Sequence, residues 1–315
     1  MVNKKIVCLG GGIGTVNLVK GLNEVSDITV IVSMADDGGS AGRLRRLYSI
    51  PPPGDLVSCI AAMSTASESM KELLSYRFTG ERYGTEESLG GHKLGNLMMV
   101  GLTSILGDFS KALSQMQTIF KTRGKILPAT TEPVSIWATT SVGERVDREE
   151  NIDLGRFTGT IEKLHLKPNN PTTSLSVKDA IMSADLIIAG PGDLYSTILP
   201  VLLVPAISHA IAKTKAKKLY IVNVANKLFE TPNYKVQDYI QAIATHCGDN
   251  IFDLVLMNSN ITAIIPDKYK RQYEFVPLNY EKDKAYSVIG KDIVNTKFPL
   301  YHDSQKLAKV VLENI

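Results

Sequence analysis

Short apolar runs alternate with glycine-rich turns and amphipathic segments in the first part of the chain. Runs rich in β-branched residues predict strands at Ile6–Leu9 and Ile28–Met34. A helical spacing of apolar residues then predicts a helix over Thr15–Asn23, and Asp55 is predicted to cap another that ends near Met63. The same spacing predicts further helices at Ser67–Phe78, Leu94–Leu106 and Phe109–Thr122.

The middle of the chain has a different pattern. Short strand-like runs separated by turns predict a small antiparallel β insertion within residues 131–170, with strands at Val134–Thr139, Glu144–Val146 and Ile161–Leu166. The alternation of strands and helices then returns. It predicts strands at Leu186–Ala189, Leu219–Val224 and Phe252–Met257, and helices at Val201–Lys213, Val236–Cys247 and Gln305–Leu312.

Strands that alternate with helices along a chain form a mostly parallel sheet with helices on both faces. We therefore predict a single Rossmann-like α/β domain over residues 1–315, doubly wound, with the antiparallel insertion in the middle of the chain. Ligands of such sheets bind at the carboxyl ends of the strands, where the strand order reverses.

Composition excludes several classes of function. The 35 basic and 32 acidic residues give a net charge of only +3, so we expect neither a nucleic-acid partner nor a charged membrane surface. Cys8, Cys59 and Cys247 are far apart, which disfavours a zinc site or a disulfide framework and fits the reducing cytoplasm. The uncharged stretch Leu194–Ala212 contains two prolines, so we expect a buried segment and no membrane span.

The first candidate site is the glycine run after the first predicted strand. Gly10, Gly11, Gly12 and Gly14 would let the backbone turn tightly and let a phosphate approach amides at a helix N-terminus. The run lacks the third glycine of the dinucleotide fingerprint, because Thr15 stands in its place. A tight turn without a ligand is the alternative.

The second candidate site follows the second predicted strand. Asp36 and Asp37 are adjacent carboxylates that could hold Mg²⁺ or a ribose hydroxyl, and the glycines would keep the loop open. The arginines of this segment could clamp phosphate. A solvated turn is the alternative. The candidate residues here are Asp36, Asp37, Gly38, Gly39, Ser40 and Arg43, with Arg45 and Arg46 as further cations.

Two further segments have glycines beside polar residues. His92 and Asn96 stand at the start of a predicted helix, as a candidate acid/base and a candidate polar ligand, although a lone histidine there is more often a cap or a packed ring. The segment after the strand at 186–189 repeats the glycine pattern, and a second phosphate or sugar subsite competes there with a plain turn. Its candidate residues are Gly190, Gly192, Asp193 and Tyr195, with Asn223 after the next strand.

Together these segments resemble the gluconeogenesis factor (YvcK-like) family, which is related to the CofD-like 2-phospho-L-lactate transferases. The likeness runs from Ile6 to about Asn258 and is clearest in ADDGGSAGRLR, PPPGD, GGHKLGN, LPAT and GPGDLYSTILP. The chain departs from the family at Ile13, Ala41 and Asp193, where the family usually has threonine, serine and serine. It also has Tyr301 in place of the arginine of a late Arg-His-Asp motif.

The resemblance implies a Rossmann-like core, cytoplasmic residence and a role in cell shape and in growth on gluconeogenic carbon. It implies that members bind a UDP-sugar and do not turn it over. It further implies that Asp36 and Asp37 match the acidic pair near the acceptor and metal of the transferases, and that His92 and Asn96 match their pocket helix.

Two functions follow as hypotheses. The first is a non-catalytic regulator that binds a phosphate-bearing small molecule, and it fits a sequence without a recognisable nucleophile motif. The second is a Mg²⁺-dependent transferase of a phosphoryl-linked group, in which Asp36 and Asp37 hold the metal. NAD is a further candidate ligand, because Asp36 lies at a suitable distance beyond the glycines for a ribose contact. We also expect a homo-oligomer, with a dimer favoured.

Overall fold

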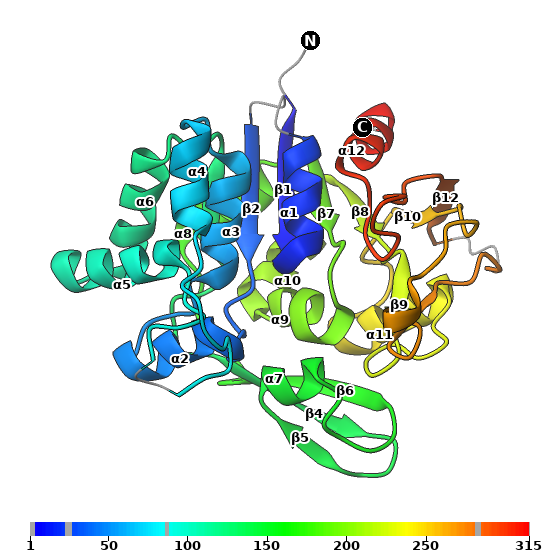
Figure 1. Cartoon of the computed structure of the whole chain (residues 1–315). Helices are drawn as coiled ribbons and strands as arrows, with labels where there is room; N and C mark the ends of the chain where they lie inside the picture. The colour runs from blue at the N-terminus through cyan, green and yellow to red at the C-terminus, as the bar shows by residue number, and fades with distance from the viewer. Residues whose placement is uncertain (1–3, 23–26, 86–87, 281–284, 315) are drawn as a thin grey trace.

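The computed structural model describes residues 4–22, 27–85, 88–280 and 285–314 (Figure 1). Its centre is a seven-stranded sheet in which every neighbouring pair is parallel. The strand order is β12-β10-β8-β7-β1-β2-β3, so the order reverses between β1 and β7. The strands are β1 (Lys5–Gly10), β2 (Asp27–Val32), β3 (Lys125–Pro128), β7 (Leu186–Ala189), β8 (Lys217–Ile221), β10 (Leu254–Asn258) and β12 (Ser287–Lys291).

Alternation of side chains along each strand supplies two cores. In β1, Ile6 and Cys8 face one core while Val7 and Leu9 face the other, because successive strand residues point to opposite faces. The first core includes residues of α1 (Gly12–Gly21), α2 (Gly39–Tyr48), α3 (Gly54–Met63), α4 (Glu68–Ser75), α5 (Leu94–Leu106), α6 (Phe109–Ile119) and α12 (Ser304–Glu313). The second includes residues of α8 (Leu175–Met182), the π-helix η1 (Leu194–Ile198), α9 (Leu199–Leu202), α10 (Pro205–Lys213) and α11 (Val236–Cys247). The predicted Rossmann-like α/β class is therefore confirmed.

The predicted antiparallel insertion forms a separate small sheet. Strand β4 (Ser135–Thr140) pairs with β5 (Arg145–Asp147) on one side and with β6 (Ile161–Lys167) on the other. A short helix, α7 (Glu149–Asp153), lies between β5 and β6 in the chain. Figure 1 shows this unit beyond the carboxyl ends of β1 and β2. A two-stranded sheet of β9 (Ala225–Lys227) and β11 (Tyr273–Phe275), and the 3-10 turn η2 (Asp267–Tyr269), complete the assigned elements.

Several local predictions differ from the structure. The segment predicted as a loop after β2 forms helix α2 from Gly39 onward. Its glycines and polar residues gave no helical pattern of apolar positions. Strands β3 and β12, at the two edges of the sheet, are short and were not predicted. The helix predicted over Val201–Lys213 is two helices, because Pro205 starts α10. Helix α1 starts at Gly12, before the predicted Thr15, and the predicted last residue Asn23 lies outside the described residues.

The predicted cap of α3 is also wrong. Asp55 lies inside the first turn of α3, Pro53 occupies the N-cap position, and no side chain caps the helix. The Asp55 carboxylate has a different partner, described below.

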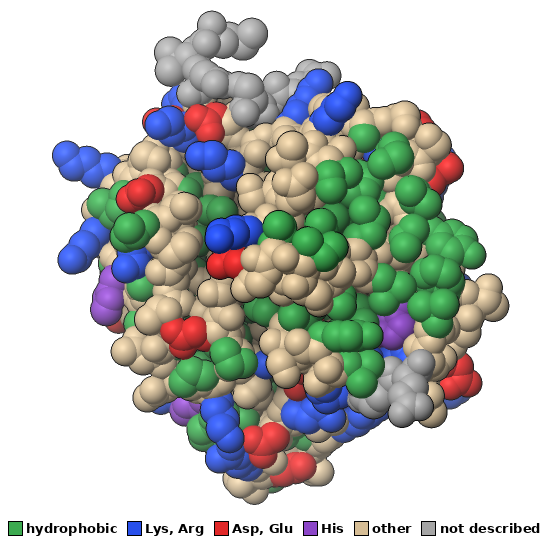
Figure 2. All heavy atoms as spheres, turned by 90° about the vertical axis from the view of Figure 1, so that its left-hand side faces the viewer, with side chains coloured by type: hydrophobic (Ala, Val, Ile, Leu, Met, Phe, Trp, Pro, Cys, Tyr) green, Lys and Arg blue, Asp and Glu red, His purple; other side chains and the backbone are tan. Residues whose placement is uncertain are grey.

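In the described part of the chain, no single helix is long and apolar enough to cross a membrane. Among the described residues, only the helix pair Leu194–Leu202 and Pro205–Lys213 is together long and apolar enough for a membrane span, and the two helices are bent by 71° relative to each other. On the outside, α5 contains no charged residue and exposes Ile105 and Leu106 (79% and 39% exposed), on the side of the molecule that Figure 2 shows with many hydrophobic side chains. The expected homo-oligomer stays a prediction.

The close approach of α1 to α12 gives a prediction for stability. A Cβ at Gly21 would clash with the carbonyl oxygen of Ser304 and lie 2.8 Å from the Cβ of Ala308. We therefore expect Gly21→Ala to lower the free energy of unfolding by about 1–3 kcal/mol, as overpacking does. The control is Gly101→Ala in α5, whose Cβ would meet nothing within 4 Å. It should raise stability by about 0.5–1 kcal/mol, because alanine is the better helix former. Urea denaturation measures the stability of both variants. If Gly21→Ala is as stable as the unsubstituted protein, α1 and α12 do not approach each other closely at Gly21.

Candidate functional site

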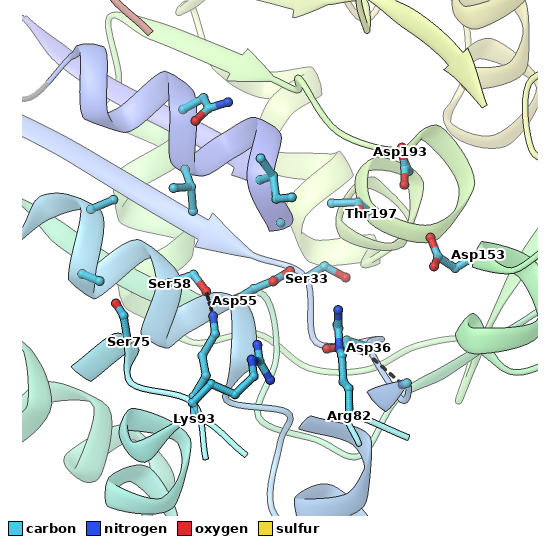
Figure 3. A pocket seen from close by; sticks show the side chains of 18 of the residues that line it. Ser33, Asp36, Asp55, Ser58, Ser75, Arg82, Lys93, Asp153, Asp193 and Thr197 are labelled. Atoms are coloured by element: carbon cyan, nitrogen blue, oxygen red, sulfur yellow. Dashed lines mark hydrogen bonds between the residues drawn. The ribbon is translucent and has the colours of Figure 1, made fainter. Parts of the chain in front are cut away.

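A cavity of about 930 Å³ opens at the carboxyl ends of β1, β2 and β7 (Figure 3). Gly12 lines it after β1, Ser33 and Asp36 line it after β2, and Asp193 lines it after β7. The strand order reverses at this point of the sheet, so the cavity lies where ligands of doubly wound sheets bind.

The amino end of α1 is already occupied by a carboxylate of the protein. Asp55 of α3 accepts a hydrogen bond from the backbone N–H of Gly12. A Cβ at Gly11 would clash with Asp55 Oδ2, so a larger residue there would displace this carboxylate. The partial positive charge at a helix N-terminus favours a carboxylate there. The phosphate predicted at Gly10–Gly14 would therefore have to compete with Asp55 for these amides.

The amino end of η1 is occupied in the same way. Glu230 Oε1 accepts hydrogen bonds from the N–H groups of Tyr195 (2.6 Å) and Ser196 (2.8 Å). Withdrawal from water raises the pKa of Glu230 to about 8. Tyr195 itself is 2% exposed, and its hydroxyl lies 2.8 Å from that of Tyr234, so its ring packs in the core.

The other glycines of the two loops serve close packing. A Cβ at Gly14 would clash with the carbonyl oxygen of Pro191, so α1 and the loop after β7 meet there without a side chain between them. Gly190 has φ +85°, and its Cβ would lie 2.6 Å from the carbonyl oxygen of Ile221. The amide of Gly192 donates to Asn223 Oδ1 at 3.0 Å. Asn223, a predicted ligand residue, thus holds this loop in place.

Asp36 and Asp37 point to different surroundings although they are adjacent. Asp36 lines the cavity, and its Oδ1 accepts a hydrogen bond from Gly38 N at 3.0 Å. The Asp37 carboxylate instead accepts hydrogen bonds from Arg148 Nε (3.2 Å) and from Glu150 N (3.0 Å). Asp37 therefore attaches the insertion to the main sheet. The predicted metal pair stays a prediction, and in this structure Asp37 has protein partners.

The arginines of α2 hold backbone carbonyl groups. Arg43 is 2% exposed and donates to the carbonyl oxygens of Thr85 (2.6 Å), Ser88 (3.0 Å) and Gly90 (2.6 Å). Arg45 donates to three other carbonyl groups, and Arg46 donates to that of Asp37. Arg43, Arg45 and Arg46 therefore hold loops around the cavity, and none of the three lines it.

The remaining predicted residues of this region lie around the loop that Arg43 holds. His92 and Asn96 are 3% and 2% exposed and do not line the cavity, whereas Lys93 between them does. Ser40 is buried and accepts a hydrogen bond from Arg77 Nη1 at 3.3 Å. Gly39 has φ +50°, and the side chain of Arg82 lies against it.

Two walls of opposite charge face the cavity, and sequence reasoning missed most of both. The lining also includes Lys20, Lys71, Glu68 and Glu72, and Asp36 and Asp55 lie near the cations. We call Arg77, Arg82 and Lys93 the basic wall, and Glu149, Asp153 and Asp193 the acidic wall. Figure 3 shows Lys93 and Asp193 on opposite sides of the view. Of the residues of the two walls only Asp193 was a candidate. Lys93 lies inside the GGHKLGN motif, which was its available signal, but the others come from segments without a motif.

Lys227 forms ion pairs with two carboxylates of the acidic wall. Its ammonium forms ion pairs with Asp153 and, at 3.3 Å, with Asp193. Asp153, Asp193 and Glu230 each have an oxygen within 4.8 Å of the others, which is the spacing of a metal site. Lys227 supplies the positive charge at this cluster, and it links α7 of the insertion to the loop after β7.

Comparison with known proteins identifies the family. A family model of 2-phospho-L-lactate transferase CofD matches residues 6–298. This chain belongs to the CofD family. It is 37% identical to the gluconeogenesis factor of Bacillus subtilis, over 98% of this chain and 97% of that protein. It is also 37% identical to the gluconeogenesis factor of Halalkalibacterium halodurans, over 99% and 97%. A crystal structure of a UPF0052 family member from Bacillus halodurans superposes with a TM-score of 0.90 at 36% identity, covering 99% of each chain.

The resemblance inferred from the motifs is thereby confirmed. Two of the positions at which this CofD family member departs from the usual motifs, Ile13 and Asp193, line the cavity. Ala41 and Tyr301 do not.

Burial and neighbouring charges shift the pKa values of Asp36 and of one group in each wall of this CofD family member. Withdrawal from water, and then the neighbouring Asp55, raise the pKa of Asp36 to about 7. Withdrawal from water and the charge of Asp36 also raise the pKa of Glu149. Withdrawal from water and then Arg77 lower the pKa of Lys93. Each wall therefore holds like charges close together, which a ligand of opposite charge would relieve.

The raised pKa of Asp36 predicts how stability depends on pH. The folded protein holds this proton more tightly than the unfolded chain, so the contribution of Asp36 to the free energy of unfolding should fall as pH rises from about 4 to about 7. Asp36→Asn keeps the acceptor for Gly38 N and removes the charge. We expect the variant to be more stable than the unsubstituted protein at pH 8, by about 1–4 kcal/mol, with little difference at pH 4. Thermal unfolding at pH 4 and at pH 8 measures this difference. If the variant is less stable than the unsubstituted protein at pH 8, the ionised Asp36 carboxylate does not destabilise the fold.

Proposed function

We propose that this chain is a cytoplasmic, non-catalytic regulator that binds a nucleotide such as a UDP-sugar and is required for cell shape and for growth on gluconeogenic carbon. The observation that carries the proposal is the cavity of about 930 Å³ at the reversal point of the sheet, with basic and acidic walls. Its size suits a nucleotide-sized small molecule.

The chemistry of the lining supports a ligand with both phosphate and hydroxyl groups. Guanidinium and ammonium groups bind phosphate. Carboxylates and serine or threonine hydroxyls accept hydrogen bonds from sugar hydroxyls. The cavity brings these groups together in one space, with Arg82 and Lys93 on one wall and Asp153 and Asp193 on the other.

The relatives' names support a role in growth on gluconeogenic carbon. Proteins from Bacillus subtilis and Halalkalibacterium halodurans that match nearly the whole chain are named gluconeogenesis factor, a name that specifies no reaction. That role is proposed for this chain by analogy with them.

The proposal predicts binding without turnover. Titration calorimetry should detect UDP-glucose binding, and mass spectrometry after a long incubation with Mg²⁺ should recover the ligand intact. NADH incubated with a panel of carbonyl compounds should keep its absorbance, because we expect no redox chemistry. Enzyme-dependent loss of UDP-glucose, or oxidation of NADH, would contradict a purely binding role.

The alternative is a Mg²⁺-dependent transferase of a phosphoryl-linked group, as the family model's name suggests. The pair Asp36 and Asp55 favours it, because both carboxylates line the cavity. After the larger effect of burial, the charge of Asp55 also raises the pKa of Asp36, so the two groups interact. Carboxylates in such a pair, together with ligand phosphates, suit Mg²⁺. In this chain Asp36 and Asp55 would hold the ion, and the ion would neutralise charge on the phosphates.

A comparison of two neighbouring carboxylates tests the metal. Mg²⁺ should raise the affinity for UDP, and Asp36→Asn should reduce that enhancement by about tenfold or more, because a charge-assisted contact contributes about 1.5–3 kcal/mol. Asp37→Asn is the matched control, because the Asp37 carboxylate is bound to Arg148 and Glu150. Calorimetry with Mg²⁺ or EDTA measures both. If only Asp37→Asn loses the enhancement, the metal belongs to the pair predicted from the sequence. Equal binding in EDTA would remove the support for a transferase.

A further inference from the structure

The basic wall of the cavity is built by one segment of the chain. Arg77 and Lys93 form an isolated antiparallel bridge through their backbones, and Arg82 lies in the loop between them. Arg43 fixes this loop through the carbonyl groups of Thr85, Ser88 and Gly90. The three cations therefore reach the cavity from a loop that Arg43 holds, outside the glycine-rich loops that follow β1 and β7.

These cations have few partners among the residues that the structure describes. Lys93 Nζ donates to Ser58 Oγ at 2.9 Å, and Arg77 donates to the carbonyl oxygen of Gly91 and to Ser40 Oγ. Arg82 lies against Gly39 and near the ring of Tyr83. Within the described ranges none of the three forms an ion pair with a carboxylate. Their like charges lower the pKa of Arg77 and of Lys93, after the larger effect of withdrawal from water.

The places where a phosphate would ordinarily bind are taken. The amide of Gly12 at the start of α1 donates to Asp55, and the amides of Tyr195 and Ser196 at the start of η1 donate to Glu230. The acidic wall would repel a phosphate as well. Of the other lysines that line the cavity, Lys71 is paired with Glu68 and Lys20 stands alone on α1, so the basic wall is the place where several cations are gathered.

We propose that Arg77, Arg82 and Lys93 form the phosphate subsite of the cavity, and that a diphosphate binds there and not at the amides of the glycine-rich loops. This inference rests on the proposed function in taking the cavity as the ligand site. It assigns the phosphates to residues that no phosphate-binding motif contains. Two guanidinium groups and an ammonium on one wall match the charge of a diphosphate, and a guanidinium binds phosphate oxygens in pairs.

Titration calorimetry with inorganic pyrophosphate and with UDP tests the subsite. Arg82→Gln and Lys93→Gln should each weaken binding of both probes about ten- to a hundredfold, since each removes a charge-assisted contact. Lys111→Gln on α6, an exposed lysine that does not line the cavity, is the control for net charge and should bind like the unsubstituted protein. Lys93→Arg should recover part of the affinity. Thermal unfolding establishes that each variant is folded.

Gly12→Ala separates the basic wall from the glycine loop. Its Cβ would meet no atom within 4 Å, but Gly12 has φ +63°, where alanine is strained, so thermal unfolding must first show that the variant is folded. Under the proposal the folded variant loses less affinity for pyrophosphate than Arg82→Gln or Lys93→Gln does. The proposal is overturned if Gly12→Ala abolishes binding while Arg82→Gln and Lys93→Gln do not, or if pyrophosphate and UDP both fail to bind.

The same titrations distinguish this inference from the proposed function. If pyrophosphate binds and depends on Arg82 and Lys93 but no UDP-sugar binds, the phosphate subsite stands and the UDP-sugar function fails. If UDP-glucose binds with equal affinity in all the folded variants, the function stands and the subsite is refuted.

Discussion

The hydrogen bond between Asp55 and the amino end of α1 determines how the rest of the cavity is organised. It brings the start of α3 against the glycine loop after β1, and only glycine at position 11 leaves room for the carboxylate. Burial raises the pKa of Asp55, and the contact with the helix N-terminus offsets part of that rise. Burial, and then the nearby Asp55, raise the pKa of Asp36. The Asp55 carboxylate therefore occupies the helix N-terminus at which an anionic ligand of this fold would bind. It also forms, with Asp36, an acidic part of the cavity lining.

Glu230 repeats this arrangement on the other side of the reversal point. It satisfies the amides at the start of η1, and its neighbour Lys227 holds Asp153 and Asp193. Lys227 therefore connects the insertion to the loop after β7, as the contacts of Asp37 with Arg148 and Glu150 connect it to the loop after β2. Two polar attachments hold α7 over the cavity. The insertion is thus a wall of the site as well as an appendage of the sheet.

Like charges lie close together, and repel each other, on both sides of the cavity. Carboxylates lie together around Asp36 and Glu149, and cations lie together around Lys93, while each group is partly withdrawn from water. A fold under selection for stability alone would have no reason to keep these groups unpaired, because isolated charges away from water are costly. Such clusters are typical of binding and catalytic sites, where a ligand supplies the missing charge.

The sequence by itself determined the architecture, because strand and helix periods are local. The continuous apolar run of β1, which is buried on both faces, and the helical spacing of apolar residues in α11 mark buried elements, so the sheet, the insertion and most helices could be predicted. Edge strands β3 and β12 escaped prediction because each contains only two adjacent aliphatic residues, Ile126 and Leu127 in β3 and Val288 and Ile289 in β12. Helix α2 escaped because glycine and polar residues occupy most of its first turns. The motifs also marked the correct end of the sheet.

Only the tertiary structure decided which side chains meet there. Local sequence could not reveal that Asp55 and Glu230 would take the helix amides, that Arg43 and Asp37 would hold loops, or that Arg77, Arg82 and Lys93 would face Asp153 and Asp193. These contacts join residues far apart in the chain, and their partners depend on how the elements pack. A glycine-rich loop carries the same local signal whether a phosphate or a carboxylate of the protein satisfies its amides.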